Sequence, residues 1–196
     1  LHPGDLLAAL AGGDAALVVL CRPNNPTGNL FPREAILGAL EAGAWVVADE
    51  AYYEFSGETV ADLLGRHPRL LVFRTLSKAF ALAGLRVGYA LGHPQALACL
   101  RSVMQPYSVD SFSLAAARVA LEHRALMAGW VKAICRERER LTRRLRALVG
   151  VRPWPSLANF VLVQVLPESG CPAEAVVGAL AERGVRVRYW PDEPRL

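Results

Sequence analysis

A single lysine is the first residue of this sequence that could do covalent chemistry. Lys78 lies in the run TLSKAF at 75–80, directly after the apolar stretch 70–73. Lysine and arginine together number 22, yet only Lys78 and Lys132 are lysines. Arginine stays protonated, whereas a desolvated lysine can lose its proton and attack a carbonyl carbon. Lys78 is therefore a candidate nucleophile, although a lone lysine is more often an ordinary surface residue.

Polar residues also stand at the ends of three other predicted strands. The apolar run 15–21 is followed by RPNNPTG at 22–28, and the apolar run 44–48 is followed by DEAY at 49–52. Arg86 stands at the start of a fourth apolar run. Ligands of parallel α/β sheets bind beyond the carboxyl ends of the strands. We therefore expect these polar side chains and Lys78 to meet at one edge of a sheet.

This set of side chains suits a flat, charged cofactor that carries an aldehyde and a phosphate. A lysine can bond to the aldehyde, a carboxylate can keep a ring nitrogen protonated, and an amide and a phenol can bind a ring oxygen. A serine and an arginine can bind a phosphate. Each residue alone is equally typical of a turn, a helix cap or a surface ion pair. Their joint occurrence at four strand ends favours a binding site.

Three motifs resemble those of the class II pyridoxal-phosphate aminotransferases of fold type I. The run TLSKAFALAG at 75–84 resembles the lysine signature, and NNPTG at 24–28 and DEAY at 49–52 resemble its companions, in the expected order. The runs 49–55 and 82–89 most resemble those of the histidinol-phosphate aminotransferases. The resemblance implies pyridoxal 5'-phosphate as cofactor. It implies amino transfer from histidinol phosphate to 2-oxoglutarate, which yields imidazole-acetol phosphate and L-glutamate in histidine biosynthesis.

The resemblance also implies a role for each matching residue. Lys78 would bond to the cofactor and move a proton during the reaction, and Asp49 would pair with the ring nitrogen. Asn25 and Tyr52 would bind the ring oxygen. The cofactor phosphate would be bound by Thr75, Ser77 and Arg86. Arg188 would bind the substrate's phosphate or carboxylate.

Three of these assignments leave an alternative open. Thr75 is as well suited to stabilising the strand-to-loop turn as to binding phosphate. Arg186 falls on the same face of the predicted strand 184–189 as Arg188, so the pattern does not separate the two. Asn159, in the run SLANF at 156–160, resembles a family motif, but a turn-stabilising asparagine is the favoured interpretation.

Alternating apolar strands and helices predict an α/β fold with a mostly parallel sheet covered by helices on both faces. We expect residues 1–108 to form the large cofactor-binding domain without its N-terminal half. Residues 109–196 would form connecting helices and a small α+β domain without its C-terminal end. The expected strands are 15–21, 44–48, 70–73, 87–91, 158–165 and 184–189, and the expected helices are 32–41, 59–65, 94–104, 111–122, 126–149 and 172–183.

Composition limits the other possible classes of protein. Hydrophobic residues make up 53% of the chain and charged residues 20%, with a net charge of +4, so a folded core is expected and a polyanion partner is not implied. The arginine-rich run 136–146 also contains glutamates and is interpreted as a solvated helix face rather than a nucleic-acid site. The four cysteines lack metal or redox spacing and are expected to be buried free thiols in a cytoplasmic protein. We expect no metal site and no membrane span.

Three alternatives to this function remain at the level of sequence. The first is another class II aminotransferase, acting on aromatic amino acids. The second is a lyase similar to threonine-phosphate decarboxylase on the same fold. The third is an aminotransferase-like sensing domain of a transcription regulator. Under the favoured interpretation the complete chain is a homodimer that acts on a small-molecule amino donor and a 2-oxo acid, and residues 1–196 alone are expected to be inactive.

Overall fold

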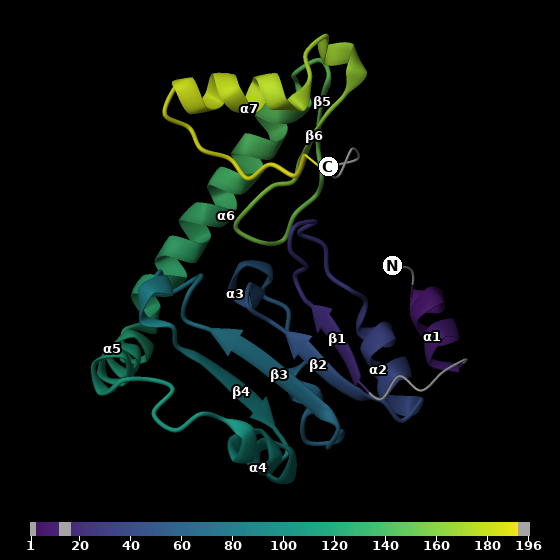
Figure 1. Cartoon of the computed structure of the whole chain (residues 1–196), viewed down its shortest axis with the longest axis vertical. Coiled ribbons are helices and arrows are strands. Elements are labelled where there is room, and N and C mark those ends of the chain that lie inside the picture. The colour runs from purple at the N-terminus through teal and green to yellow at the C-terminus, as the bar shows by residue number, and fades with distance from the viewer. Residues whose placement is uncertain (1–2, 12–16, 192–196) are drawn as a thin grey trace.

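A four-stranded sheet forms the centre of the molecule. The computed structural model describes residues 3–11 and 17–191, so positions 15 and 16 of the first predicted strand lie outside the described residues. The strands lie in the order β1 (Leu17–Cys21), β2 (Trp45–Asp49), β3 (Leu70–Thr75) and β4 (Gly88–Gly92) (Figure 1). The pairs β1–β2 and β2–β3 are parallel and the pair β3–β4 is antiparallel. The predicted, mostly parallel α/β sheet is therefore confirmed.

The direction of β4 decides where the site residues can meet. A parallel partner of β3 would need a crossover connection, usually a helix. The connection 76–87 instead turns back and contains only the short 3₁₀ helix η2 (Ala83–Leu85). Thr75 at the end of β3 consequently pairs with Gly88 at the start of β4. The start of β4 therefore lies at the same edge as the carboxyl ends of the other three strands.

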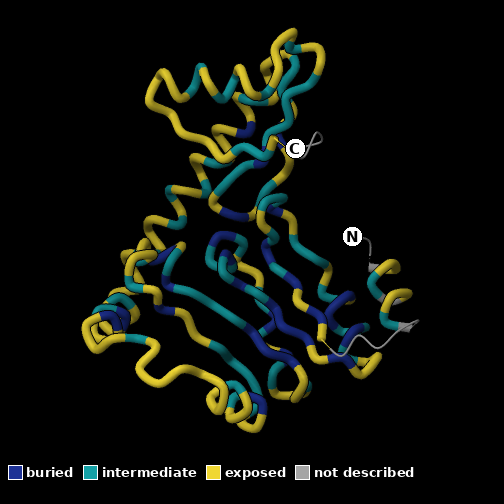
Figure 2. Tube along the Cα trace, in the orientation of Figure 1, coloured by how far each residue is buried: buried dark blue, intermediate teal, exposed yellow. Residues whose placement is uncertain are grey.

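Helices cover both faces of the sheet. On one face, Ile36 of α2 packs with Val46, Leu70 and other buried strand residues in the largest core cluster. On the other face, Ala96 of α4 packs with Val47 and the residues around it. Figure 2 shows that burial is concentrated in the sheet and the elements next to it. The elements of this region outside the sheet are α1 (Pro3–Ala11), α2 (Arg33–Glu41), α3 (Tyr53–Ser56), η1 (Ala61–Leu63) and α4 (Pro94–Val103).

A long helix leads from the sheet to a second, smaller region (Figure 1). Helix α5 lies beside the central sheet, where its Ala117 packs in one cluster with Tyr52, and α6 leads to a region with a two-stranded antiparallel sheet of β5 and β6 and one further helix, α7. The arginine-rich face of α6 is largely solvated, as predicted. The elements are α5 (Ser111–Glu122), α6 (Arg124–Arg146), β5 (Val151–Pro153), β6 (Val163–Val165), η3 (Pro167–Ser169) and α7 (Ala173–Glu182).

Two strand predictions in this region were wrong. The predicted strand 158–165 is regular only over its last three residues, because those are the ones that pair with β5. The predicted strand 184–189 has no regular structure, although its residues alternate in polarity. A strand needs a hydrogen-bonded neighbour, and the Val185 N–H instead donates to the Leu180 carbonyl at the end of α7, at 2.9 Å. The argument that placed Arg186 and Arg188 on one strand face therefore no longer holds.

The structure tests the expectation that the four cysteines are buried free thiols and shows whether any described helix could cross a membrane. All four cysteines are free, but Cys99 and Cys171 are exposed, which corrects the expectation that all four are buried. Cys99 lies on α4, and Cys171 lies in the connection before α7. Within the described part of the chain, no helix combines the length and the apolar character that crossing a membrane requires.

Candidate functional site

The turn after β1 brings an amide to the sheet edge. The Gly28 N–H donates to the Asn24 carbonyl at 2.7 Å, and the Asn24 N–H donates to the Asn29 carbonyl at 2.8 Å. The Asn24 side chain adds a hydrogen bond to the Thr27 hydroxyl at 2.7 Å. Gly28 has a φ of +74°, in the left-handed region that favours glycine. Residues 24–29 thus form a closed turn that leaves the Asn25 side chain within it exposed at the edge.

Asn25, Tyr52 and Lys78 come together as predicted, from three different strand ends. The Asn25 Nδ2 donates to the Tyr52 hydroxyl at 3.0 Å. The Lys78 Nζ lies 5.3 Å from the centroid of the Tyr52 ring, within range of a cation–π interaction. The Tyr52 ring is buried and makes an edge-to-face contact with Phe160, at a centroid distance of 5.2 Å. An amide, a phenol and an amine therefore share one small volume.

Asp49 ends β2 beside these residues, and both of its oxygens have a donor. Its Oδ1 accepts a hydrogen bond from the Ala51 N–H at 3.0 Å. Its Oδ2 accepts from the Cys21 thiol across 3.8 Å, since Cys21 is its register partner on β1. Burial, and then the negative charge of Asp49, raise the pKa of the Cys21 thiol, so the thiol stays protonated and remains a donor. Cys21 was not among the predicted site residues, although the parallel register of two adjacent strands could have identified it.

The two predicted hydroxyls lie in the turn after β3. The Ser77 N–H donates to the Thr75 Oγ1 at 3.1 Å, and the Thr75 hydroxyl lies 3.2 Å from the Val87 carbonyl and 2.9 Å from the Ser77 hydroxyl. Thr75 thus stabilises the turn, which supports the alternative role proposed for it. Ser77 remains accessible beside it.

Arg86 lies on the chain opposite Ser77. The Leu76 N–H donates to the Val87 carbonyl at 3.0 Å, which extends the β3–β4 pairing by one residue. Ser77 and Arg86 follow next on the two antiparallel chains. Arg86 is exposed, has a φ of +55°, and donates from Nη1 to the Ala83 carbonyl at 3.1 Å. A guanidinium and a hydroxyl therefore stand at the same edge, as an oxyanion ligand would require.

Arg188 is a predicted ligand whose described contacts lie outside the sheet edge. Its guanidinium carbon lies 5.7 Å from the centroid of the Trp190 ring. The segment that carries it has no regular structure. Its role as a substrate ligand stays a prediction.

The charges at the sheet edge are not used for internal ion pairs. Among the residues that the structure describes, Lys78, Asp49 and Arg86 form no salt bridge, whereas Arg22 and Arg74 do. An unpaired carboxylate, amine and guanidinium near one another favour a ligand that has a cationic nitrogen, a reactive carbonyl and an oxyanion. The cofactor implied by the resemblance has all three, so the residues present fit it.

Glu54, on α3, is a further titratable group next to this edge. Burial raises the pKa of its carboxyl to about 7, and its Oε2 is buried without a hydrogen-bond partner among the described residues. Carboxyl groups with a pKa shifted by burial are found preferentially at functional sites. Neither its position in DEAYYEF nor its charge indicated this in the sequence.

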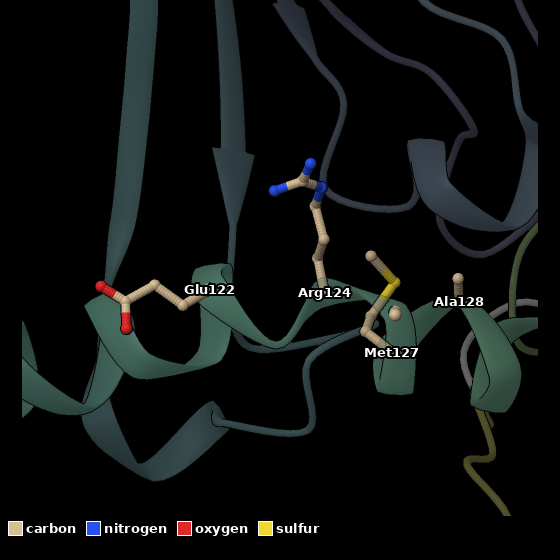
Figure 3. Close-up of a pocket in the computed structure, with 5 residues that line it drawn as sticks. Glu122, Arg124, Met127 and Ala128 are labelled. Carbon is tan, nitrogen blue, oxygen red and sulfur yellow. The ribbon is translucent and has the colours of Figure 1, made fainter.

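One surface hollow lies away from the predicted site residues. A shallow hollow of about 460 Å³ at the junction of α5 and α6 is lined by Glu122, Arg124, Ala125, Met127 and Ala128. Figure 3 shows that the Glu122 and Arg124 side chains point in different directions, so no polar groups converge there. It contains none of the predicted site residues and is not a candidate for the site.

A protein-family model matches nearly the whole chain. The model described as "Aminotransferase class I and II" matches residues 3–192. A histidinol-phosphate aminotransferase of Thermococcus kodakarensis is 44% identical over 94% of this chain and 51% of its own length. One from Frankia casuarinae is 45% identical over 96% of this chain and 48% of its own length. The chain therefore spans about half the length of the curated relatives that it matches.

The solved structures agree with the sequence relatives. The histidinol-phosphate aminotransferase of Sinorhizobium meliloti, solved in complex with pyridoxal-5'-phosphate, superposes with a TM-score of 0.83 at 30% identity. The match covers 95% of this chain and 52% of that one. The likeness therefore extends over both regions of the fold described above.

Proposed function

This chain belongs to the class I and II aminotransferase family, and from that premise we propose that it carries the cofactor-binding part of a histidinol-phosphate aminotransferase. The reaction would move the amino group of histidinol phosphate to 2-oxoglutarate. The observation that carries the proposal is the meeting of Lys78, Asn25 and Tyr52 beside an unpaired Asp49. The similarity to histidinol-phosphate aminotransferases over most of the chain supports the choice of substrate.

Pyridoxal 5'-phosphate is the proposed cofactor. When bound, it would accept electrons from the substrate carbon that loses its proton, and this is chemistry that no protein side chain supplies. Lys78 would hold its aldehyde carbon and Asp49 its ring nitrogen. Asn25 and Tyr52 would bind its ring oxygen. Ser77 and Arg86 would bind its phosphate, with Thr75 shaping the turn that presents Ser77.

The side chains of this chain perform three tasks in the proposed reaction. Lys78, exposed on a turn that opens to the site edge, can take a proton from the substrate carbon and return it, a contribution of about 10²–10⁴-fold. Asp49 accepts a hydrogen bond on each carboxylate oxygen, and these two bonds fix the orientation of its carboxylate. Tyr52 has its hydroxyl bound by Asn25 and its ring packed on Phe160, which limits its motion.

Two further parts of the proposal concern the complete protein. We expect a homodimer, because the family resemblance implies that a partner subunit lends a residue to the site. We also expect a cytoplasmic enzyme, since a biosynthetic role with small-molecule substrates and free thiols suits a reducing compartment. Residues 1–108 and 109–196 are proposed as parts of the large and small domains. Arg188 is proposed to reach the substrate's phosphate.

The test uses residues 1–196 within a chain of the relatives' full length, called the extended chain below. Its absorbance is scanned with pyridoxal phosphate, and then with histidinol phosphate or L-glutamate added. We expect a visible band of lysine-bound cofactor that changes to the aminated cofactor with either amine. The Lys78→Ala variant should lack the first band, and Lys132→Ala, which changes the other lysine, should keep it.

Other outcomes identify the alternatives. A band that ignores histidinol phosphate but responds to aromatic amino acids would favour the aromatic aminotransferases. Release of carbon dioxide from threonine phosphate would favour the lyase. Absence of any lysine-bound cofactor would contradict the proposed function and leave the sensing domain.

A further inference from the structure

A short segment of the second region contacts the site from outside the sheet. Residues 156–160, called the strap below, connect β5 to β6 and have no regular structure. In Figure 1 the loop between these two strands reaches from the small sheet down toward the end of β1. None of the functional roles proposed above uses this segment, apart from the contact of Phe160 with Tyr52.

One end of the strap is attached to the turn that carries Asn25. The Leu157 N–H donates to the Gly28 carbonyl at 2.8 Å. A Cβ at position 28 would lie only 2.9 Å from the Ser156 Cα and closer still to its side chain, so the two backbones approach as closely as a glycine permits. The position of the Asn25 turn and that of the strap are therefore coupled.

The other end of the strap packs against Tyr52. Phe160 makes the edge-to-face contact at 5.2 Å, and Ala158 is fully buried in the same apolar cluster as Tyr52. Aromatic pairs of this geometry contribute to positioning beyond the area that they bury. The strap therefore contacts Tyr52 directly and contacts its hydrogen-bond partner Asn25 through the turn at Gly28.

A largely covered arginine of α6 holds the middle of the strap. The Arg138 Nη1 donates to the Ala158 carbonyl at 2.9 Å, and the exposed fraction of the Arg138 side chain is only 9%. The Ala158 N–H donates to the Ser156 hydroxyl at 3.1 Å, which closes the strap on itself. The neighbouring arginine Arg136 is 74% exposed and lies only near Glu137, at 4.0 Å. Arg138 is thus distinct among the arginines of this helix face in reaching the strap.

We propose that Arg138, acting through the strap, is a positioning residue that fixes Tyr52 and Asn25 relative to each other for the reaction. The inference rests on the proposed function, because the reaction supplies the need for a fixed phenol. Removal of the guanidinium frees the Ala158 carbonyl and loosens Phe160, so the phenol occupies a wider range of positions. Small misplacements of reacting groups cost large factors in rate.

The experiment compares Arg138→Met with the matched control Arg136→Met in the extended chain. The first readout needs no cofactor: hydrogen exchange of the Leu157 amide, expected to be about 10-fold faster in Arg138→Met because the strap opens locally. The second is the pH midpoint of the absorbance of lysine-bound pyridoxal phosphate, expected to rise because a misplaced phenol no longer stabilises the negative ring oxygen. The third is steady-state kinetics, with kcat expected to fall about 10-fold and KM to change less than about twofold.

Two variants separate positioning from folding. Arg138→Lys keeps a donor that can reach the Ala158 carbonyl. Its pH midpoint and its kcat should therefore be close to those of the wild type. If Arg138→Met does not fold, Phe160→Leu carries the test, since it removes the ring contact but keeps the Arg138 hydrogen bond. Its midpoint should rise while the exchange of the Leu157 amide stays at the wild-type rate.

The outcomes are distinguishable from failure of the proposed function. Equal amide exchange, midpoint and kcat in Arg138→Met and Arg136→Met would overturn the proposal while leaving the enzyme intact. An unshifted midpoint in Phe160→Leu would also overturn it. A wild-type extended chain that binds no pyridoxal phosphate would overturn the proposed function, and Leu157 exchange alone would then decide whether Arg138 holds the strap.

Discussion

Asp49 and Glu50 are neighbours at the end of β2, yet the molecule treats their carboxylates in opposite ways. Glu50 is completely buried and belongs to a paired network that also contains Thr59, Val60 and Arg74. Its oxygens accept from the Thr59 hydroxyl at 2.7 Å, the Val60 N–H at 2.7 Å and the Arg74 Nη2 at 2.9 Å. Asp49 is half-buried and has no cationic partner among the described residues.

The comparison distinguishes a charge that stabilises the fold from a charge kept for a ligand. Removing one partner of a buried pair leaves the other charge without compensation, so loss of either Glu50 or Arg74 alone should destabilise the fold. Asp49, Lys78 and Arg86 remain unpaired within the described chain, which would be a poor arrangement if stability alone had selected it. Unpaired charges that converge at a sheet edge are typical of binding sites.

The largest expected effect is on activity, from Lys78. Lys78→Ala should lower kcat of the extended chain by about 10²–10⁴-fold, since the amine both holds the cofactor and moves the proton. The melting temperature should hardly change, because the side chain is exposed. Lys132→Ala provides the control. A Lys78→Ala variant with wild-type turnover would end the proposed assignment.

A comparable effect on stability is expected from Glu50. Glu50→Ala should reduce the free energy of unfolding by about 3–5 kcal/mol, because Arg74 is left buried without its partner. Denaturant unfolding measures the change. Glu137→Ala, which removes an exposed partner of Arg140, should change stability little. Equal stability of the two variants would contradict the structural role of the network.

Asp49 should show the reverse of Glu50. Asp49→Asn should lower kcat by about 10²–10³-fold, because the fixed negative charge opposite the ring nitrogen is lost. The unfolding free energy should stay close to that of the wild type, because the amide keeps the size of the carboxyl and no ion pair is broken. Kinetics and denaturation of the same preparation test both halves. An Asp49→Asn variant that is unstable but active would contradict the assignment of Asp49 to the ligand and not to the fold.

A smaller effect is expected from the phenol. Tyr52→Phe removes the hydroxyl bound by Asn25 but keeps the ring that packs on Phe160. Loss of one hydrogen bond to the negative ring oxygen of the cofactor should lower kcat about 10-fold. The pH midpoint of the cofactor absorbance should rise in the same variant. If neither quantity moves, the hydroxyl has no part in the site.

The smallest effect concerns pH and Glu54. The folded pKa of about 7 lies above the ordinary value of 4.5, so the folded state binds the extra proton between these values. Stability should therefore fall as the pH rises from about 4.5 through 7. Glu54→Gln should remove this dependence and stabilise the protein at pH 8 by on the order of 1 kcal/mol, reduced by solvent at a partly exposed carboxyl. Unfolding curves at pH 5 and pH 8 provide the measurement, and parallel losses in both proteins would contradict the burial of Glu54.

The parts of the fold that could be predicted are those set by neighbouring residues. Helix α5 over Ser111–Glu122 matches its predicted range, because Asp110 caps it and accepts from the Ser113 N–H at 2.8 Å. The four strands of the central sheet were also found, since short apolar runs bounded by turn residues are typical of buried strands. The segment 184–189 has the same kind of local pattern but lacks a partner strand, so its prediction failed.

The sequence alone determined the family, the order of the elements and the chemical types of the site, because motif residues and apolar periods are local properties of the chain. Tertiary structure decided the rest. The antiparallel return of β4 puts Arg86 opposite Ser77, and the parallel register sets the Cys21 thiol against Asp49. Packing between α6, the strap and α3 brings Arg138 to the Ala158 carbonyl and Phe160 to Tyr52. These contacts join residues far apart in sequence, and their geometry depends on pairing and packing that no local pattern specifies.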